Sequence, residues 1–167
     1  MSIEILTQEF CNELIKLNDN KAAMAELKRG LAHPPGEYPP QYKYLIPIIP
    51  WKTNQYPWFL TASLYGLHPV DTNKGNIGTS FRELKKITQS ESIDLRFNSL
   101  LQCKLEDLYY HLRNAVSLFS SAGVPVNYKE LLKSLLNWEN DSRFVQINWA
   151  KEFWLREQTN NNQNKEK

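Results

Sequence analysis

Cationic side chains recur beside apolar positions of this sequence, and they are its clearest candidates for chemistry. Arg82, Lys85 and Lys86 follow the spacing i, i+3, i+4 and so share one face of a predicted helix. The other cations of this kind are Lys28, Arg29, Arg96, Arg113 and Arg143. An arginine at the edge of a buried helix face is restricted in motion and presents a planar fork of N–H donors, which suits a phosphate group. We therefore take these cations as a candidate phosphate-binding set.

A structural role for the same cations is the alternative. Lys28 and Arg29 fall in the last turn of a predicted helix, where each cation stabilises the helix dipole by about 0.3–1 kcal/mol. Other cations could pair with Asp94, Glu106 or Glu152. The sequence leaves both roles open, and the recurrence of the cations favours a surface that meets phosphates.

Motifs that mark enzymes are weak in this chain. The three histidines lie on different predicted elements, and no HExxH, GxSxG or P-loop pattern occurs. "GNIG" at 75–78 resembles half of a phosphate loop but lacks the preceding strand and the lysine. Cys11 and Cys103 lie far apart and form no CxxC pattern, which argues against a zinc site or a disulfide. We therefore expect no catalytic site, no metal, no cofactor and no small-molecule substrate.

The composition is that of an ordinary globular domain. The 167 residues are 41% hydrophobic and 23% charged, with a formal net charge of +2. No apolar run approaches the roughly 20 residues that a membrane-spanning helix requires, and the N-terminus lacks the features of a signal peptide. We expect a cytoplasmic protein with no membrane partner. Because the net charge is small, only the placement of the cations can indicate a nucleic-acid partner.

The apolar residues recur with helical periodicity, which predicts an all-α protein. The candidate cations lie on these predicted helices or at their ends. We expect about eight helices, over residues 3–17, 21–29, 57–67, 79–89, 92–101, 105–121 and 127–138, and from the cap at 140–142 onward. No alternating run of β-branched residues predicts a strand. Trp138 and Trp149 are expected in the core, while the place of Trp154 stays open.

Two segments depart from the helical pattern. The connection at about 33–58 holds seven prolines, which forbid a continuous helix, and six aromatic residues. Because flexible proline-rich linkers are poor in aromatics, we expect an ordered connection, with one short helix at about 41–45. The segment 158–167 is predicted to be a disordered polar tail, which leaves a single all-α domain over 1–157.

An ordered set of motifs gives the chain a family resemblance. The motifs are "AELKRGL" (25–31), "PPGE" (34–37), "LYGLHP" (64–69), "GNIGTSFREL" (75–84), "SESIDLRFNSLL" (90–101), "LYYHLRNAV" (108–116), "GVPVNYKELLKSLLNWE" (123–139) and "RFVQINWAKEFW" (143–154). From about Ile3 to Trp154, the chain closely resembles the CasB family, the small subunits of the type I-E CRISPR surveillance complex Cascade. The resemblance implies two packed helical bundles, which we place at about 1–89 and 92–157, and no enzymatic activity.

The resemblance also implies partners. They are the backbone and large subunits of Cascade, a second copy of the chain, the heteroduplex of crRNA and target DNA, and the displaced DNA strand. The implied function is non-catalytic: phosphate contacts to both DNA strands stabilise the R-loop. The main alternative is a helical adaptor that binds only protein, with its cations held in ion pairs.

Residue by residue, the family's basic positions match Lys28, Arg29, Arg82, Arg96, Arg113 and Arg143. Lys85 and Lys86 come from the helical stripe alone. The sequence departs from many relatives at Glu83 and Asn114, where a second basic residue is common. We therefore expect either a weaker strand-binding face or a compensating role for Lys85 and Lys86.

Overall fold

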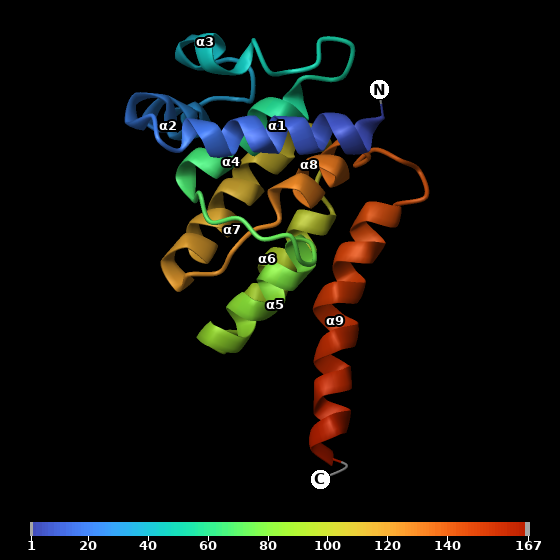
Figure 1. Ribbon diagram of the computed structural model, residues 1–167. Helices are drawn as coiled ribbons and strands as arrows, with labels where there is room; N and C mark the ends of the chain where they lie inside the picture. Colours follow the sequence, from blue (N-terminus) through green and yellow to red (C-terminus); the bar gives the residue numbers. More distant parts are fainter. Residues whose placement is uncertain (1, 166–167) are drawn as a thin grey trace.

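The chain folds into a set of packed helices (Figure 1). The structure is a computed structural model that describes the backbone of residues 2–165 and the side chains of residues 2–155. Within that range the non-helical pairing is an isolated parallel bridge between Asp71 and Val126, and no strand is present. The predicted all-α class is confirmed.

The helices follow the predicted order along the chain. They are α1 (Ile3–Leu17), α2 (Lys21–Arg29), α3 (Tyr42–Leu45), α4 (Tyr56–Leu67), α5 (Ile77–Thr88), α6 (Ser92–Leu101), α7 (Leu108–Ala122), α8 (Tyr128–Leu136) and α9 (Phe144–Lys165). Short 3₁₀ turns occupy Gly30–Ala32, Pro39–Gln41 and Leu105–Asp107. The N-cap side chains of Ser2, Asn20 and Asn127 each accept a backbone N–H from the first turn of the following helix.

Helix α5 begins two residues before the predicted start at Thr79. The Asn76 side chain accepts the N–H of Gly78 at 2.8 Å, and the Thr79 hydroxyl accepts the N–H of Asn76 at 3.0 Å. This reciprocal capping box satisfies backbone donors that would otherwise lack a partner at the helix start. Asn76 is therefore the N-cap of α5, and Thr79 belongs to its first turn.

The proline-rich connection is ordered, as predicted, because polar side chains fix it to the helices. Gln41 is buried, and its amide nitrogen donates to the Leu27 carbonyl at 3.0 Å and to the Ser63 hydroxyl at 2.7 Å. Gly30 makes this possible, since a Cβ atom there would lie 1.9 Å from the Gln41 nitrogen. The end of α2, which carries two candidate cations, is thereby held against α4.

One continuous cluster of buried side chains extends from α1 to α9. Helix α4 runs through its centre, with Trp58, Leu60 and Leu64 fully buried. Trp138 and Trp149 are also buried, as predicted, with their ring centroids 5.1 Å apart. The cations must therefore lie around this core, either on its surface or between its outer helices.

Helix α9 is longer than the sequence predicts. Its backbone continues to Lys165, through most of the segment 158–167 for which we expect a disordered tail. No glycine or proline occurs between Phe144 and Lys165, so no residue there interrupts a helical backbone. In Figure 1, the C-terminal part of α9 extends away from the other helices. The last two residues lie outside the described range.

Candidate nucleic-acid interface

The structure brings Arg113 on α7 to the end of α2. Its Nη1 donates to the Leu31 carbonyl at 3.2 Å, just beyond the last turn of α2, which carries Lys28 and Arg29. All three cations are exposed. Lys28 makes no ion pair within the described range, whereas Arg29 lies 2.7 Å from Glu26 and stays largely exposed. Three cations from two distant segments of the sequence thus lie at one edge of the molecule.

Glu26 contributes a negative charge to this edge, and its second oxygen is occupied. The Tyr38 hydroxyl donates to it at 2.7 Å. This hydrogen bond, together with the Arg29 contact, lowers the pKa of Glu26. The Tyr38 ring also stacks on His33 at 5.0 Å between centroids. The proline-rich connection therefore contacts the last turn of α2 through Tyr38 and helps to fix its orientation.

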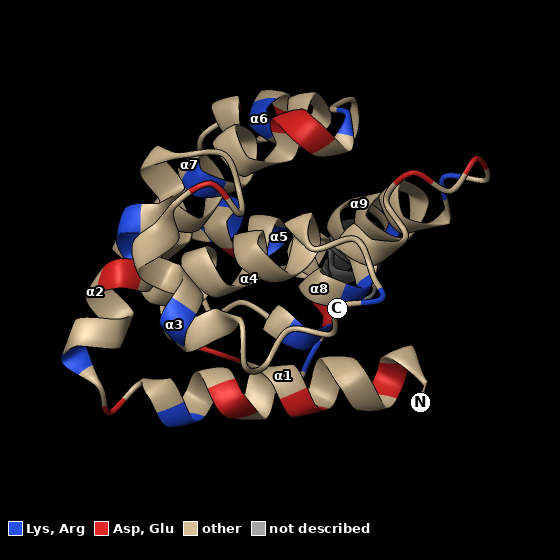
Figure 2. Ribbon diagram, turned by 90° about the horizontal axis from the view of Figure 1, so that it is seen from above, with Lys and Arg blue, Asp and Glu red and all other residues tan. Residues whose placement is uncertain are grey.

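Arg96 on α6 extends the surface. It is exposed and makes no hydrogen bond or ion pair with the described residues. With Asn114 of α7 it lines one open hollow, and Asn114 is the neighbour of Arg113 in sequence. Lys and Arg residues on α2, α7 and α6 accordingly follow one side of the molecule (Figure 2). We call the four residues Lys28, Arg29, Arg96 and Arg113 the basic face.

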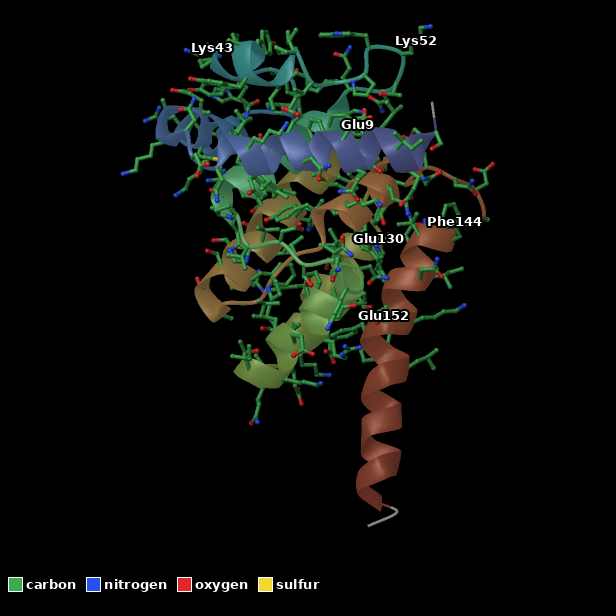
Figure 3. All side chains as sticks on the ribbon, viewed as in Figure 1. Glu9, Lys43, Lys52, Glu130, Phe144 and Glu152 are labelled. Carbon is green, nitrogen blue, oxygen red and sulfur yellow. The ribbon has the colours of Figure 1, made fainter. Side chains whose placement is uncertain are left out.

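Arg82 lies elsewhere, between α5 and α9, and its side chain is only 9% exposed. Its Nη1 donates to the backbone carbonyl of Glu152 at 2.9 Å and lies 3.6 Å from the carboxylate of the same residue. Glu152 is on the α9 side that faces α5 (Figure 3). The Arg82 guanidinium therefore joins two helices and does not present its fork to solvent.

The two lysines of the predicted stripe are also engaged within the protein. Lys85 Nζ lies 3.0 Å from Asp94 Oδ1, and it sits over the rings of Phe153 and Trp154 at 5.5 and 5.4 Å from their centroids. Lys86 is half exposed and lies 3.6 Å from Glu83. Lys85 thus joins α5 to both α6 and α9, whereas Lys86 pairs within α5. We define the α5–α9 seam by Gly78, Arg82, Lys85, Trp149 and Glu152.

Arg143 stands apart from both groups. Its φ of 56° is in the left-handed region, immediately before α9, and its Nη2 donates to the Leu101 carbonyl at 2.7 Å. The guanidinium therefore satisfies an acceptor at the end of α6. The hollow of about 420 Å³ that it lines also holds Glu106, Glu139 and Asp141, so the local charge is not positive.

A cationic cluster that the sequence did not indicate lies between α1 and α8. Lys129 and Lys133 both contact the carboxylate of Glu4, with Lys133 Nζ at 2.9 Å. Hydrogen bonds from Lys129 and then Lys133 lower the pKa of Glu4 to about 2. Because Glu4 is more than a hundred positions from both lysines, no local pattern in the sequence predicts this contact.

Groups that could carry catalysis or hold a metal are engaged in the fold or scattered. His68 is buried, with its Nε2 2.6 Å from the Val124 carbonyl, and so serves the fold. No group of three or more His, Cys, Asp or Glu side chains in the described range is placed to hold a metal ion. Within the same range, no helix has the length and apolar character needed to cross a bilayer. The four exposed cations of the basic face are the remaining candidates for a binding surface.

Fold and surface together define an all-helical protein that presents cations from several helices on one face. The family model described as CRISPR-associated protein Cse2 matches residues 23–154. A protein of that name from Thermus thermophilus is 33% identical over 155 residues, covering 88% of this chain and 89% of the relative. The chain belongs to the Cse2 family.

Solved structures agree with this assignment. A Cse2-family protein from Thermus thermophilus has a TM-score of 0.80 at 29% identity, over 89% of this chain and 97% of that chain. CasB from M. ruber gives 0.75 at 27% identity, over 92% and 97%. A chain of a structure named "CRISPR RNA-guided surveillance complex" gives 0.82 over 97% and 99%, and at 21% identity this likeness shows a shared fold.

Proposed function

We propose that this protein is the non-catalytic small subunit of a Cascade surveillance complex in the cytoplasm. In this proposal, it contacts the phosphates of the target and displaced DNA strands and so stabilises the R-loop. The observation that carries the proposal is the basic face, in which cations from α2, α6 and α7 lie exposed along one side of the molecule. Membership of the Cse2 family and the fold shared with a surveillance-complex chain support it.

The physics of strand exchange explains why such a face is useful. Replacing a DNA duplex by an RNA–DNA heteroduplex is nearly balanced in free energy, so contacts with protein can decide whether the R-loop persists. Those contacts must tolerate any sequence, and phosphates are the part of DNA that does not vary. Cations fixed on helices meet this requirement, because they offer charge without reading base edges.

The candidate cations fall into two groups, those exposed on the basic face and those engaged within the protein. Lys28 and Arg96 have no partner among the described residues, and we assign phosphate contacts to them first. Arg29 and Arg113 each use part of their guanidinium within the protein and stay exposed, so they join the same surface. Arg82 and Lys85 are assigned structural roles. The Arg82 guanidinium is held by Glu152, and the Lys85 ammonium lies beside Asp94 of α6 and over the rings of Phe153 and Trp154 of α9.

The proposed partners are the backbone and large subunits of the complex, a second copy of this chain, the heteroduplex of crRNA and target DNA, and the displaced strand. The alternative is a helical adaptor that binds only protein. The internal pairing of Arg82, Lys85 and Lys86 favours that alternative for the stripe on α5. The exposed face on α2, α6 and α7 favours nucleic-acid contact.

Reconstitution of the crRNA-bearing complex tests the proposal. The Lys28→Gln, Arg96→Gln double variant should assemble normally and lose target DNA faster than the wild type. Lys86→Gln is the matched control, because Lys86 is an exposed lysine that is paired with Glu83. If the double variant fails to enter the complex, these cations belong to a protein interface. If it retains DNA like the wild type, the face does not bind phosphate.

A further inference from the structure

An open hollow of about 310 Å³ lies between α6 and α7, beside the basic face. Leu95 and Tyr110 form part of its lining and are 71% and 61% exposed, the largest exposed fractions among the large apolar side chains described. Buried Phe81 and Ala115 also line it. Two large apolar side chains thus stand unusually open to solvent next to one hollow, which marks it as a candidate binding site.

The polar lining of this hollow is cationic. Arg96 lies in it and has no hydrogen bond or ion pair with the described residues, while Asn114 and His111 add polar edges. Among the described residues, no aspartate or glutamate lines it. Asp94, the acidic residue nearest in sequence to Arg96, is held by Lys85. An anionic ligand is therefore favoured here by charge.

A second hollow, of about 680 Å³, adjoins the first and shares Ser99, Tyr110 and His111 with it. Its lining includes Lys104 but also Glu106 and Asp107. The two carboxylates would repel a phosphate, so the charge favours an anion only on the Arg96 side. Tyr110 lines both hollows, so it marks the end of the region in which the charge favours an anion.

We propose that the first hollow, which we call the α6–α7 pocket, binds an unpaired nucleotide of single-stranded DNA. The base packs against the ring of Tyr110 and the side chain of Leu95, and its phosphate meets Arg96. This inference rests on the proposed function and adds to it a contact with a base. The pocket volume is at the lower end of the range for small-molecule sites and suits one nucleotide better than a longer segment.

The combination of one cationic and two exposed apolar side chains in the pocket indicates an unpaired nucleotide as its ligand. A phosphate alone accounts for Arg96 but not for exposed Tyr110 and Leu95. Bases in a duplex are stacked on one another and cannot enter a pocket, whereas a single strand offers their faces. Stacking on an aromatic ring tolerates any base, since every base has a π-face. Arg113, next in sequence to Asn114, continues the phosphate path toward α2.

The test compares two single-stranded oligonucleotides of equal length and charge, one with bases and one abasic. Binding to the full chain is measured by fluorescence anisotropy at low salt. We expect the wild type to bind the abasic strand about tenfold more weakly, because stacking of one base on an aromatic side chain contributes this much. Tyr110→Ala should remove the difference and Tyr110→Phe should keep it. Trp51→Ala, which alters an exposed aromatic in the connection between α3 and α4, is the control and should match the wild type.

The outcomes separate the pocket from the proposed function. Salt-dependent binding of both strands with equal affinity overturns the pocket and leaves the phosphate contacts standing. A preference for the base-containing strand that survives in Tyr110→Ala also overturns the pocket, because the base then binds elsewhere on the protein. No salt-dependent binding of either strand overturns the proposed function and the pocket with it.

Discussion

The α5–α9 seam and the basic face contain arginines in similar sequence settings and use them differently. Arg82 follows Phe81 in "SFREL", and Arg113 follows Leu112 in "HLRNA". The Arg82 side chain is buried against the Glu152 backbone. The Arg113 side chain makes one backbone contact and stays exposed. The difference comes from the neighbouring helices, since α9 covers α5 there while the exposed edge of α7 has no such cover.

This contrast shows that an arginine beside an apolar residue is not by itself a phosphate contact. Burial decides its role, because a guanidinium that is only 9% exposed and lies between two helices is not accessible to a ligand. Substitutions in the seam should therefore change stability, and substitutions on the basic face should change DNA binding. The expected changes in stability differ in size, and the largest lies in the seam.

A substitution at Gly78, where the backbones of α5 and α9 approach most closely in the seam, should have the largest effect on stability. A Cβ atom at Gly78 would lie 2.0 Å from the Trp149 carbonyl oxygen, which belongs to the backbone and cannot move aside easily. Gly78→Ala should reduce the free energy of unfolding by about 3 kcal/mol, since it forces α5 and α9 apart. Urea denaturation measures the loss. Gly123→Ala is the comparison, because no atom of the described residues lies within 4 Å of the added Cβ and only the positive φ at Gly123 opposes the change. Equal losses in both variants would contradict a tight seam.

Removal of the seam arginine should have the next largest effect. Arg82→Ala deletes the charged donor to the Glu152 carbonyl and should cost about 2 kcal/mol of unfolding free energy. Arg96→Ala, on the basic face, should change stability by less than about 0.5 kcal/mol, as is usual for exposed sites without partners. Thermal or urea unfolding of the two variants checks the ranking. A larger loss for Arg96→Ala would reverse the assignment of the two regions.

The ion pairs between α1 and α8 lie outside both the seam and the basic face. Their effect on stability should be smaller and should depend on pH. The folded-state pKa of Glu4 is about 2, below its ordinary value of 4.5, so its pairing with Lys129 and Lys133 stabilises the fold above pH 4.5. That contribution should be lost as the pH falls from about 4.5 to 2. Glu4→Gln should therefore be slightly less stable than the wild type at pH 7, with the gap closing near pH 2. A gap that does not change with pH would contradict a charge-dependent contact.

Much of the fold could be predicted from local pattern. The helices at 3–17 and 21–29 have the predicted bounds, because each begins with a capping side chain and buries a clear apolar stripe. The start of α5 was missed because its cap depends on a reciprocal bond between Asn76 and Thr79. Helix α9 runs to Lys165, beyond the apolar pattern that predicts its first turns, and the disordered tail over 158–167 stays a prediction.

The candidate site was less predictable, because contacts distant in sequence decide which cations are exposed. Glu152 is 70 positions from Arg82, and the sequence could only offer their pairing as one alternative. Lys129 and Lys133 contact a carboxylate more than a hundred positions away, so no local pattern includes them. The grouping of Lys28 with Arg113 likewise arises from the packing of α7 against the end of α2.

Salt dependence of DNA binding tests the central claim most directly. Each phosphate contact contributes about 0.9 to the slope of log affinity against log salt on duplex DNA and about 0.7 on a single strand. Lys28→Gln with Arg96→Gln should therefore lower the single-strand slope of the full chain by about 1.4, while Arg82→Gln should leave it unchanged. A slope that is the same in the wild type and the double variant would contradict the account.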